Sequence, residues 1–129
     1  MQAITQQWVD KAEGDWVSMN REGVAQNPPN HDLVCYLAQQ CAEKYLKARL
    51  QEDNVAFPKT HNLPALLALI LPIEASWNVL QVALTKLDDY GVEFRYPGHD
   101  ANAVDAQDAQ QYCKVVREVA RRGFGLPIR

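Results

Sequence analysis

The sequence predicts an all-α fold, an up-and-down bundle of four long helices and one short helix. Along four long segments, apolar residues recur at steps of three and four, which is the spacing of one helix face. Breaks rich in proline or glycine separate the segments, and no segment alternates with the period of a strand. Because 129 residues are the length of one domain, we interpret residues 1–129 as a single helical domain.

The first two expected helices are long and amphipathic. One runs from about residue 4 to about residue 26, and the run Asn27-Pro28-Pro29-Asn30 stops it because two prolines cannot continue a helix. A second helix begins near His31 or Asp32, and its buried stripe holds Val34, Ala38, Cys41, Tyr45 and Ala48. Beside that stripe runs a polar line of Gln39, Glu43 and Lys47, in which the last two are spaced for a solvated i,i+4 ion pair.

The remaining helices follow after short loops. The third, about 63–71, is apolar nearly all round, so we expect it to be buried. Thr60-His61-Asn62 supplies its candidate caps, and Pro72 ends it. The fourth begins near Ser76. The fifth follows the break 95–102 and runs to about residue 122, where Gly123 and Gly125 stop it.

Composition narrows the class of protein. With 47% hydrophobic and 22% charged residues, the chain resembles an ordinary soluble globular protein. The longest apolar run, 63–73, is broken by two prolines and is too short for a membrane span. The N-terminus lacks the layout of a signal peptide, so we expect a cytoplasmic protein with no membrane association.

The cysteines and histidines do not indicate a metal centre. Cys35, Cys41 and Cys113 form no CxxC pair, and their helical settings favour reduced, buried thiols. The three histidines lie far apart, each beside a different helix end. We therefore expect no metal site and no cofactor.

The net charge of −3 conceals a polarity along the chain. From Asp88 to Asp108 six acids accompany one base, for a net charge of −5, whereas from Tyr112 to Arg129 five bases accompany one acid, for a net charge of +4. One interpretation is compensation of a helix macrodipole by acids near its start and bases near its end. The other is a basic patch that faces phosphate.

Three separated motifs carry a resemblance. They are Gln39-Gln40-Cys41-Ala42-Glu43-Lys44-Tyr45-Leu46-Lys47-Ala48, then Lys59-Thr60-His61-Asn62-Leu63, then Arg95-Tyr96-Pro97. In this order and spacing, over about residues 12–119, the chain resembles the HEPN domain family. The resemblance implies a bundle of four or five helices that usually forms a homodimer. Members act as partners of minimal nucleotidyltransferases, as nucleotide-binding modules, or as metal-independent ribonucleases of toxin and defence systems.

The ribonuclease branch of that family uses an arginine and a histidine, often with a tyrosine two positions later. There the histidine activates a ribose 2′-OH, and the arginine stabilises charge growing on the phosphate. Here Arg95 and His99 are separated by only three residues, which include Pro97, and Ala101 stands where the tyrosine belongs. The Arg-Tyr-Pro form is more similar to the non-ribonuclease branch, in which Arg95 holds a phosphate or locks its loop.

These features lead to ranked hypotheses about function. The first is a homodimeric HEPN module of a toxin–antitoxin-like or defence system that binds a nucleotide or RNA phosphate and works with a nucleotidyltransferase. Arg95 is the central phosphate ligand, and Lys59, His61 and Lys44 are further candidates. Alternatives are a metal-independent ribonuclease toxin in which Arg95 and His99 are catalytic, and a dimeric interaction module with no ligand. A capping role for His61 or Thr60 is the structural alternative at that position.

Overall fold

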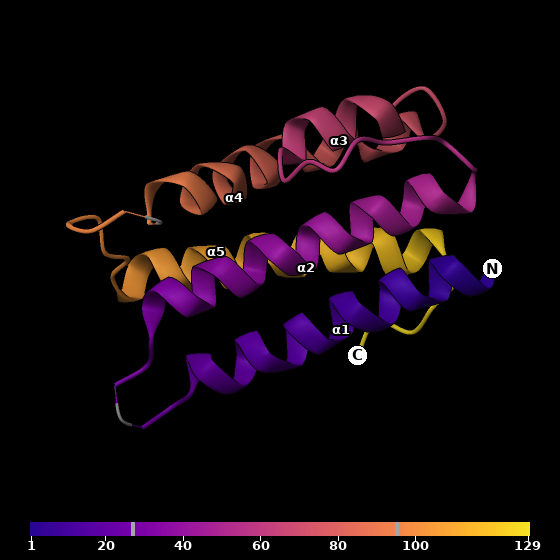
Figure 1. Ribbon diagram of the computed structural model, residues 1–129. Coiled ribbons are helices and arrows are strands. Elements are labelled where there is room, and N and C mark those ends of the chain that lie inside the picture. Colours follow the sequence, from indigo (N-terminus) through magenta and orange to yellow (C-terminus); the bar gives the residue numbers. More distant parts are fainter. Residues whose placement is uncertain (27, 95) are drawn as a thin grey trace.

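The computed structural model of the protein describes residues 1–26, 28–94 and 96–129, and its regular elements there are all helices. The α-helices are α1 (Ala3–Gly23), α2 (His31–Glu52), α3 (Leu63–Ile70), α4 (Gln81–Glu93) and α5 (Ala103–Gly123). A short 3₁₀ helix, η1 (Ala75–Leu80), leads directly into α4. The predicted all-α bundle is therefore confirmed (Figure 1).

Two helix boundaries differ from the sequence-based expectations. α1 ends at Gly23 and not near residue 26, because the N–H of Ala25 already turns back to the carbonyl of Glu22. The fourth helix begins close to Ser76 as expected, but its start is the 3₁₀ helix η1, and the α-helix proper begins only at Gln81.

Helix α2 is the centre of the bundle. It packs against α1, α3, α4 and α5. In Figure 1, α1 runs antiparallel to α2 on one side of it, while α3 and α4 lie on the opposite side. The predicted apolar stripe of α2 is fully buried, and it consists of Val34, Ala38, Cys41, Tyr45 and Ala48. Burial of this stripe, at roughly 25 cal/mol per Å² of apolar surface, is the main force that assembles the bundle around α2.

The remaining predicted core residues fall into two groups. Leu63, Leu66, Leu67 and Ile70 of α3 are buried, as its apolar composition predicts, and all three cysteines are buried free thiols. Trp77 is buried, but Trp8 and Trp16 are only half-buried against the edge of the core. None of the helices in the described part of the chain is long and apolar enough to cross a membrane.

Asparagine side chains cap the N-termini of three of the helices. Asn30 accepts from the N–H of Leu33 at the start of α2, and Asn102 forms a capping box with Asp105 at the start of α5. Asn62 caps α3. The suggested capping role of His61 or Thr60 is therefore wrong, because the cap position is occupied one or two residues later.

The connection from α4 to α5 is a tight turn folded against α2. The N–H of His99 donates to the carbonyl of Tyr96, and Gly98 has φ of +88°. Proline followed by a left-handed glycine is the sequence pattern of a type II turn, so Pro97 and Gly98 fix the chain reversal. The N–H of Ala101 then donates to Oδ1 of Asp32 at 2.7 Å, which ties the connection to the first turn of α2.

A charged cluster joins α1, α2 and α5. The carboxylate of Glu13 accepts from Nε and Nη2 of Arg117 at 2.8 and 2.7 Å, and from the hydroxyl of Tyr45 at 2.7 Å. Arg117 also donates to two backbone carbonyls of residues 128–129, and its guanidinium lies 4.7 Å from the ring centroid of Trp16. Because the Arg117 side chain is only 4% exposed, Glu13 neutralises a cation inside the bundle.

The environment of Glu13 makes this cluster sensitive to acid. Burial by itself raises the pKa of the Glu13 carboxyl, but the hydrogen bonds from Arg117 and Tyr45 and the charges of Arg117 and Arg121 outweigh it, so its pKa lies below the usual value. A carboxyl whose folded-state pKa is depressed stabilises the fold above its unfolded-state pKa. That stabilisation is lost as the pH falls through the folded-state pKa.

We expect Glu13→Gln to lower the free energy of unfolding by about 2 kcal/mol at neutral pH, because it leaves the buried Arg117 without a carboxylate. The deficit should begin to shrink as the pH falls below the usual glutamate pKa of about 4.3, and it should vanish only below the depressed pKa of the folded protein, where the wild-type carboxyl is protonated as well. Urea unfolding at several pH values measures both effects. Asp10→Asn, at an exposed position of the same helix, serves as the control and should be near neutral. A deficit that is absent at neutral pH, or unchanged in acid, would contradict the assignment.

Candidate functional site

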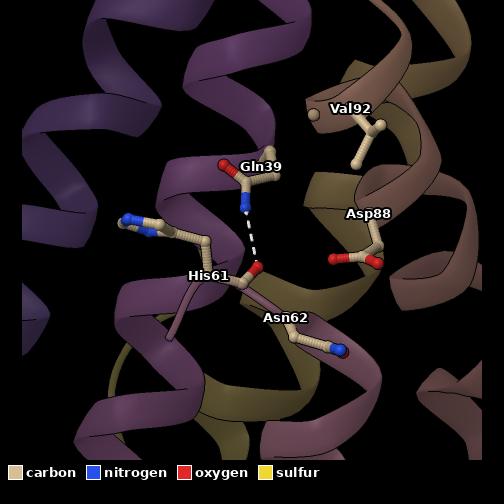
Figure 2. Close-up of a pocket in the computed structure, with 6 residues that line it drawn as sticks. Gln39, His61, Asn62, Asp88 and Val92 are labelled. Atoms are coloured by element: carbon tan, nitrogen blue, oxygen red, sulfur yellow. Dashed lines mark hydrogen bonds between the residues drawn. The ribbon is translucent and has the colours of Figure 1, made fainter. Parts of the chain in front are cut away.

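Two hollows lie along the seam between α2 and α4, and they meet at Gly91. The first has a volume of about 200 Å³, and it is lined by Gln39, His61, Asn62, Asp88, Gly91 and Val92 (Figure 2). The second has a volume of about 60 Å³, and it is lined by Asp32, Tyr36, Tyr90, Gly91 and Phe94. Together they connect the start of α3 with the end of α4, where the Arg95–His99 break begins.

Gly91 allows the two helices to approach each other at this point. A Cβ atom at residue 91 would lie 3.3 Å from Cγ of Gln39, which is tighter than ordinary van der Waals contact. Glycine inside a helix costs roughly 1 kcal/mol relative to alanine, so its presence here indicates a close helix–helix contact.

The polar line of α2 is not solvated, and this corrects the expectation from the sequence. Gln39, Glu43 and Lys47 have exposed fractions of only 2%, 3% and 7%. Nζ of Lys47 donates to Glu43 at 3.1 Å and lies 5.6 Å from the ring centroid of Trp8 and 6.0 Å from that of Phe57. The i,i+4 pair was predicted, but α1 and the segment after α2 cover it, so it is a buried ion pair and not a surface pair.

His61 is attached to this buried pair. Its Nδ1 lies 2.8 Å from Oε1 of Glu43, although 66% of its side chain is exposed. A carboxylate only accepts hydrogen bonds, so Nδ1 is the donor and Nε2 faces outward. The His61 carbonyl accepts from Nε2 of Gln39 at 3.2 Å, and Figure 2 shows that the imidazole ring points away from Asp88 and Val92. His61 is thus fixed at the rim of the first hollow.

The start of α3 does not offer free donors to an anion. The N–H of Leu63 donates to Oδ1 of Asp88 at 3.1 Å, and the N–H of Ala65 donates to Oδ1 of Asn62 at 3.0 Å. Pro64 has no N–H. The first-turn donors are therefore taken by side chains of the protein, and an anion there would have to displace a carboxylate.

The second hollow is aromatic and electronegative. The rings of Tyr90 and Phe94 stack with centroids 5.6 Å apart and an interplanar angle of 21°. The pKa of Tyr90 is raised to about 12, first by burial and then by the negative charges of Asp108 and Asp105. Burial, followed by the charges of Asp105 and Asp32, also raises the pKa of the neighbouring Cys35 thiol to about 12.

The structure places three of the four residues that the sequence grouped as phosphate ligands. Nζ of Lys44 pairs with Oδ2 of Asp15 on α1 at 2.5 Å, so that cation is already engaged. Lys59 and His99 are exposed, and Arg95 lies outside the described residues. Of the four candidates, Lys59 and His61 share the segment before α3, close to the first hollow.

Several site residues were not anticipated. Asp32, Tyr36 and Asp88 were not singled out, because nothing local to them predicts which helices face each other. A weak signal did exist: Asp32 and Tyr36, like Tyr90 and Phe94, are spaced four residues apart and so share a helix face. In the described part of the chain, no three His, Cys, Asp or Glu side chains converge as metal ligands would.

We expect Lys47→Met to destabilise the fold by about 3 kcal/mol, because it leaves the carboxylate of Glu43 buried with only His61 as a partner. The double variant Glu43→Gln/Lys47→Met should lose less than the sum of the two single changes, which a double-mutant cycle in urea measures. Arg49→Met is the matched control, since Arg49 and Asp53 form an i,i+4 pair with a more exposed partner, and it should cost at most about 1 kcal/mol. Additive losses would show that the pair is not coupled.

The comparisons with known proteins agree with this architecture. The sequence matches the family model of the HEPN domain over residues 5–123. A solved crystal structure described as an archaeal HEPN homologue aligns over 100% of both chains, with a TM-score of 0.73 and 21% sequence identity. At that identity the likeness shows the fold alone. No curated protein matches the chain. Because the family model covers most of its length, the chain belongs to the HEPN domain family.

Proposed function

We propose that this HEPN protein is the partner of a minimal nucleotidyltransferase, and that it binds the phosphate of a nucleotide with residues of the segments 59–61 and 95–99. In this proposal it belongs to the Arg-Tyr-Pro branch, forms a homodimer and works in a toxin–antitoxin-like or defence context. Arg95, Lys59 and His61 contact the phosphate. Lys44 is left out, because Asp15 engages it.

The observation that carries the ligand part is the fixed imidazole of His61 at the rim of the first hollow. Glu43 and Lys47 neutralise each other behind it, so the ring is held by a pair of no net charge while its Nε2 faces solvent. Lys59 stands two residues earlier and is exposed. With Nδ1 donating to Glu43, Nε2 can donate to a phosphate oxygen only in the imidazolium form, so the proposed ligands are the His61 imidazolium and the Lys59 ammonium.

Charge favours a small nucleotide over RNA. A protein that follows an RNA strand neutralises several phosphates with several cations. Residues 88–108, which include the second of the two proposed segments, carry six acids and only one base. A single phosphate can be held by a few cations within such a field, whereas a long polyanion is repelled. The same charge argues against the ribonuclease alternative, which needs an RNA strand across Arg95 and His99.

We expect the wild type to bind a ribonucleoside monophosphate from a panel of four in isothermal titration. His61→Ala and Lys59→Ala should each weaken that binding about fivefold, in line with the loss of one charge-assisted hydrogen bond. Lys86→Ala, at an exposed position of α4 outside both hollows, is the control and should bind as the wild type does. Absence of binding heat, or equal affinities in all variants, would contradict the proposed ligand.

Growth on induced expression separates the proposal from the ribonuclease alternative. We expect the wild type expressed alone to be harmless, because no RNA is cut. If the wild type were toxic and His99→Ala abolished the toxicity, the ribonuclease function would replace the proposal. Co-purification with a minimal nucleotidyltransferase from the same genome tests the partner. Failure to bind it, together with absent nucleotide binding, would favour an interaction module with no ligand.

A further inference from the structure

The second hollow differs in size and chemistry from a nucleotide site. Ligand pockets for small molecules occupy roughly 300–1,000 Å³, whereas this hollow has a volume of about 60 Å³. One water molecule needs roughly 10–15 Å³ of such space, so the hollow holds a few water molecules or the head group of one side chain, and not a nucleobase with its ribose.

The walls of the hollow suit a cation. Tyr36 is 51% exposed at its edge, and the stacked rings of Tyr90 and Phe94 form another wall. Aromatic faces attract ammonium and guanidinium groups. Asp32 adds a carboxylate whose Oδ1 is bound to the N–H of Ala101, while no hydrogen bond from a described residue reaches its Oδ2. The hollow therefore offers aromatic faces and one carboxylate oxygen to a ligand.

The surroundings of the hollow carry charge of the same sign. Asp89, Glu93, Asp100 and Asp108 are all exposed on the end of α4, the connection and the start of α5. Burial is the main cause of the raised pKa of Tyr90, and the negative charges of Asp108 and Asp105 raise that pKa further. Such a field accelerates the approach of a basic segment and repels an acidic one.

We propose that the hollow lined by Asp32, Tyr36, Tyr90 and Phe94 is the docking point for an arginine or lysine side chain of a basic segment of a partner protein. The guanidinium or ammonium group lies against the aromatic rings and pairs with Oδ2 of Asp32, while the acids around the hollow attract the flanking basic residues. This proposal deepens the partner half of the proposed function and does not depend on nucleotide binding. Mutation of His61 or Lys59 leaves it untouched.

Arginine amide is the probe for this site, and glycine amide, which has the same α-ammonium group but no guanidinium, is the matched control. In titrations of the full chain followed by NMR, we expect arginine amide to shift the resonances of Tyr36, Tyr90 and Phe94 first, with an affinity that falls as salt is added. Tyr36→Ala should weaken the binding about fivefold, whereas Tyr36→Phe, which keeps the aromatic face, should bind like the wild type. Tyr36 is half exposed, so neither change threatens the fold.

Three results would overturn the proposal. Shifts spread evenly over the acidic residues would show a diffuse field and no site. Tighter binding of arginine amide to Arg95→Ala would show that a side chain of the same chain competes for the hollow. Salt-sensitive self-association that Tyr36→Ala abolishes would identify a second copy, through its basic C-terminal end, as the occupant. Loss of nucleotide binding alone would contradict the proposed ligand and leave this docking point standing.

Discussion

The burial of α2 among four other helices is the constraint on which the rest of the structure depends. A helix of 22 residues that is covered on most sides cannot keep its polar side chains in water. Each of them needs a partner inside the protein, because an unpaired buried charge or amide is costly. Tyr45 is bound by Glu13 and Arg121, Gln39 by the chain before α3, and Glu43 by Lys47 and His61. Apart from Lys47 of α2 itself, the partners come from α1, α5 and the 53–62 segment, so the hydrogen bonds that α2 requires also position these elements around it.

The same constraint explains what sequence analysis predicts well and where it fails. Helix periodicity identifies the face of α2 that faces the core, and every residue of that predicted stripe is buried. An interpretation from periodicity assumes, however, that one face of the helix is exposed to solvent, and α2 has almost no exposed face. The Glu43–Lys47 pair is therefore predicted to be solvated, although α1 and the segment after α2 cover it. The pairing of Glu43 with Lys47 was visible in the sequence because it is local. The contact of Glu43 with His61 spans 18 residues and was not visible.

Local features of the candidate site can be predicted from the sequence, whereas contacts between helices cannot. The Pro97-Gly98 dipeptide marks its turn, and Asn62 lies within the predicted cap segment. Lys44 appeared free because its partner, Asp15, belongs to another helix 29 residues away. The aromatic hollow combines one i,i+4 pair from α2 with one from α4, and each pair by itself is unremarkable. Which two helix faces meet is decided by packing around the Gly91–Gln39 contact, and no single helix contains that information.

The positions of the side chains change the interpretation of the charge polarity along the chain. Two of the five bases in the C-terminal region, Arg117 and Arg121, are committed to Glu13, Tyr45 and backbone carbonyls of residues 127–129. The positive charges of these two arginines are therefore paired largely with groups of the protein itself. Asp105 in turn serves the capping box of α5, as macrodipole compensation predicts. Among the described residues, none forms an ion pair with the exposed acids Asp89, Glu93, Asp100 and Asp108, so the acidic end of the bundle presents a negative surface. For the proposed function, such a negative surface favours a basic protein partner and a small nucleotide over an RNA strand.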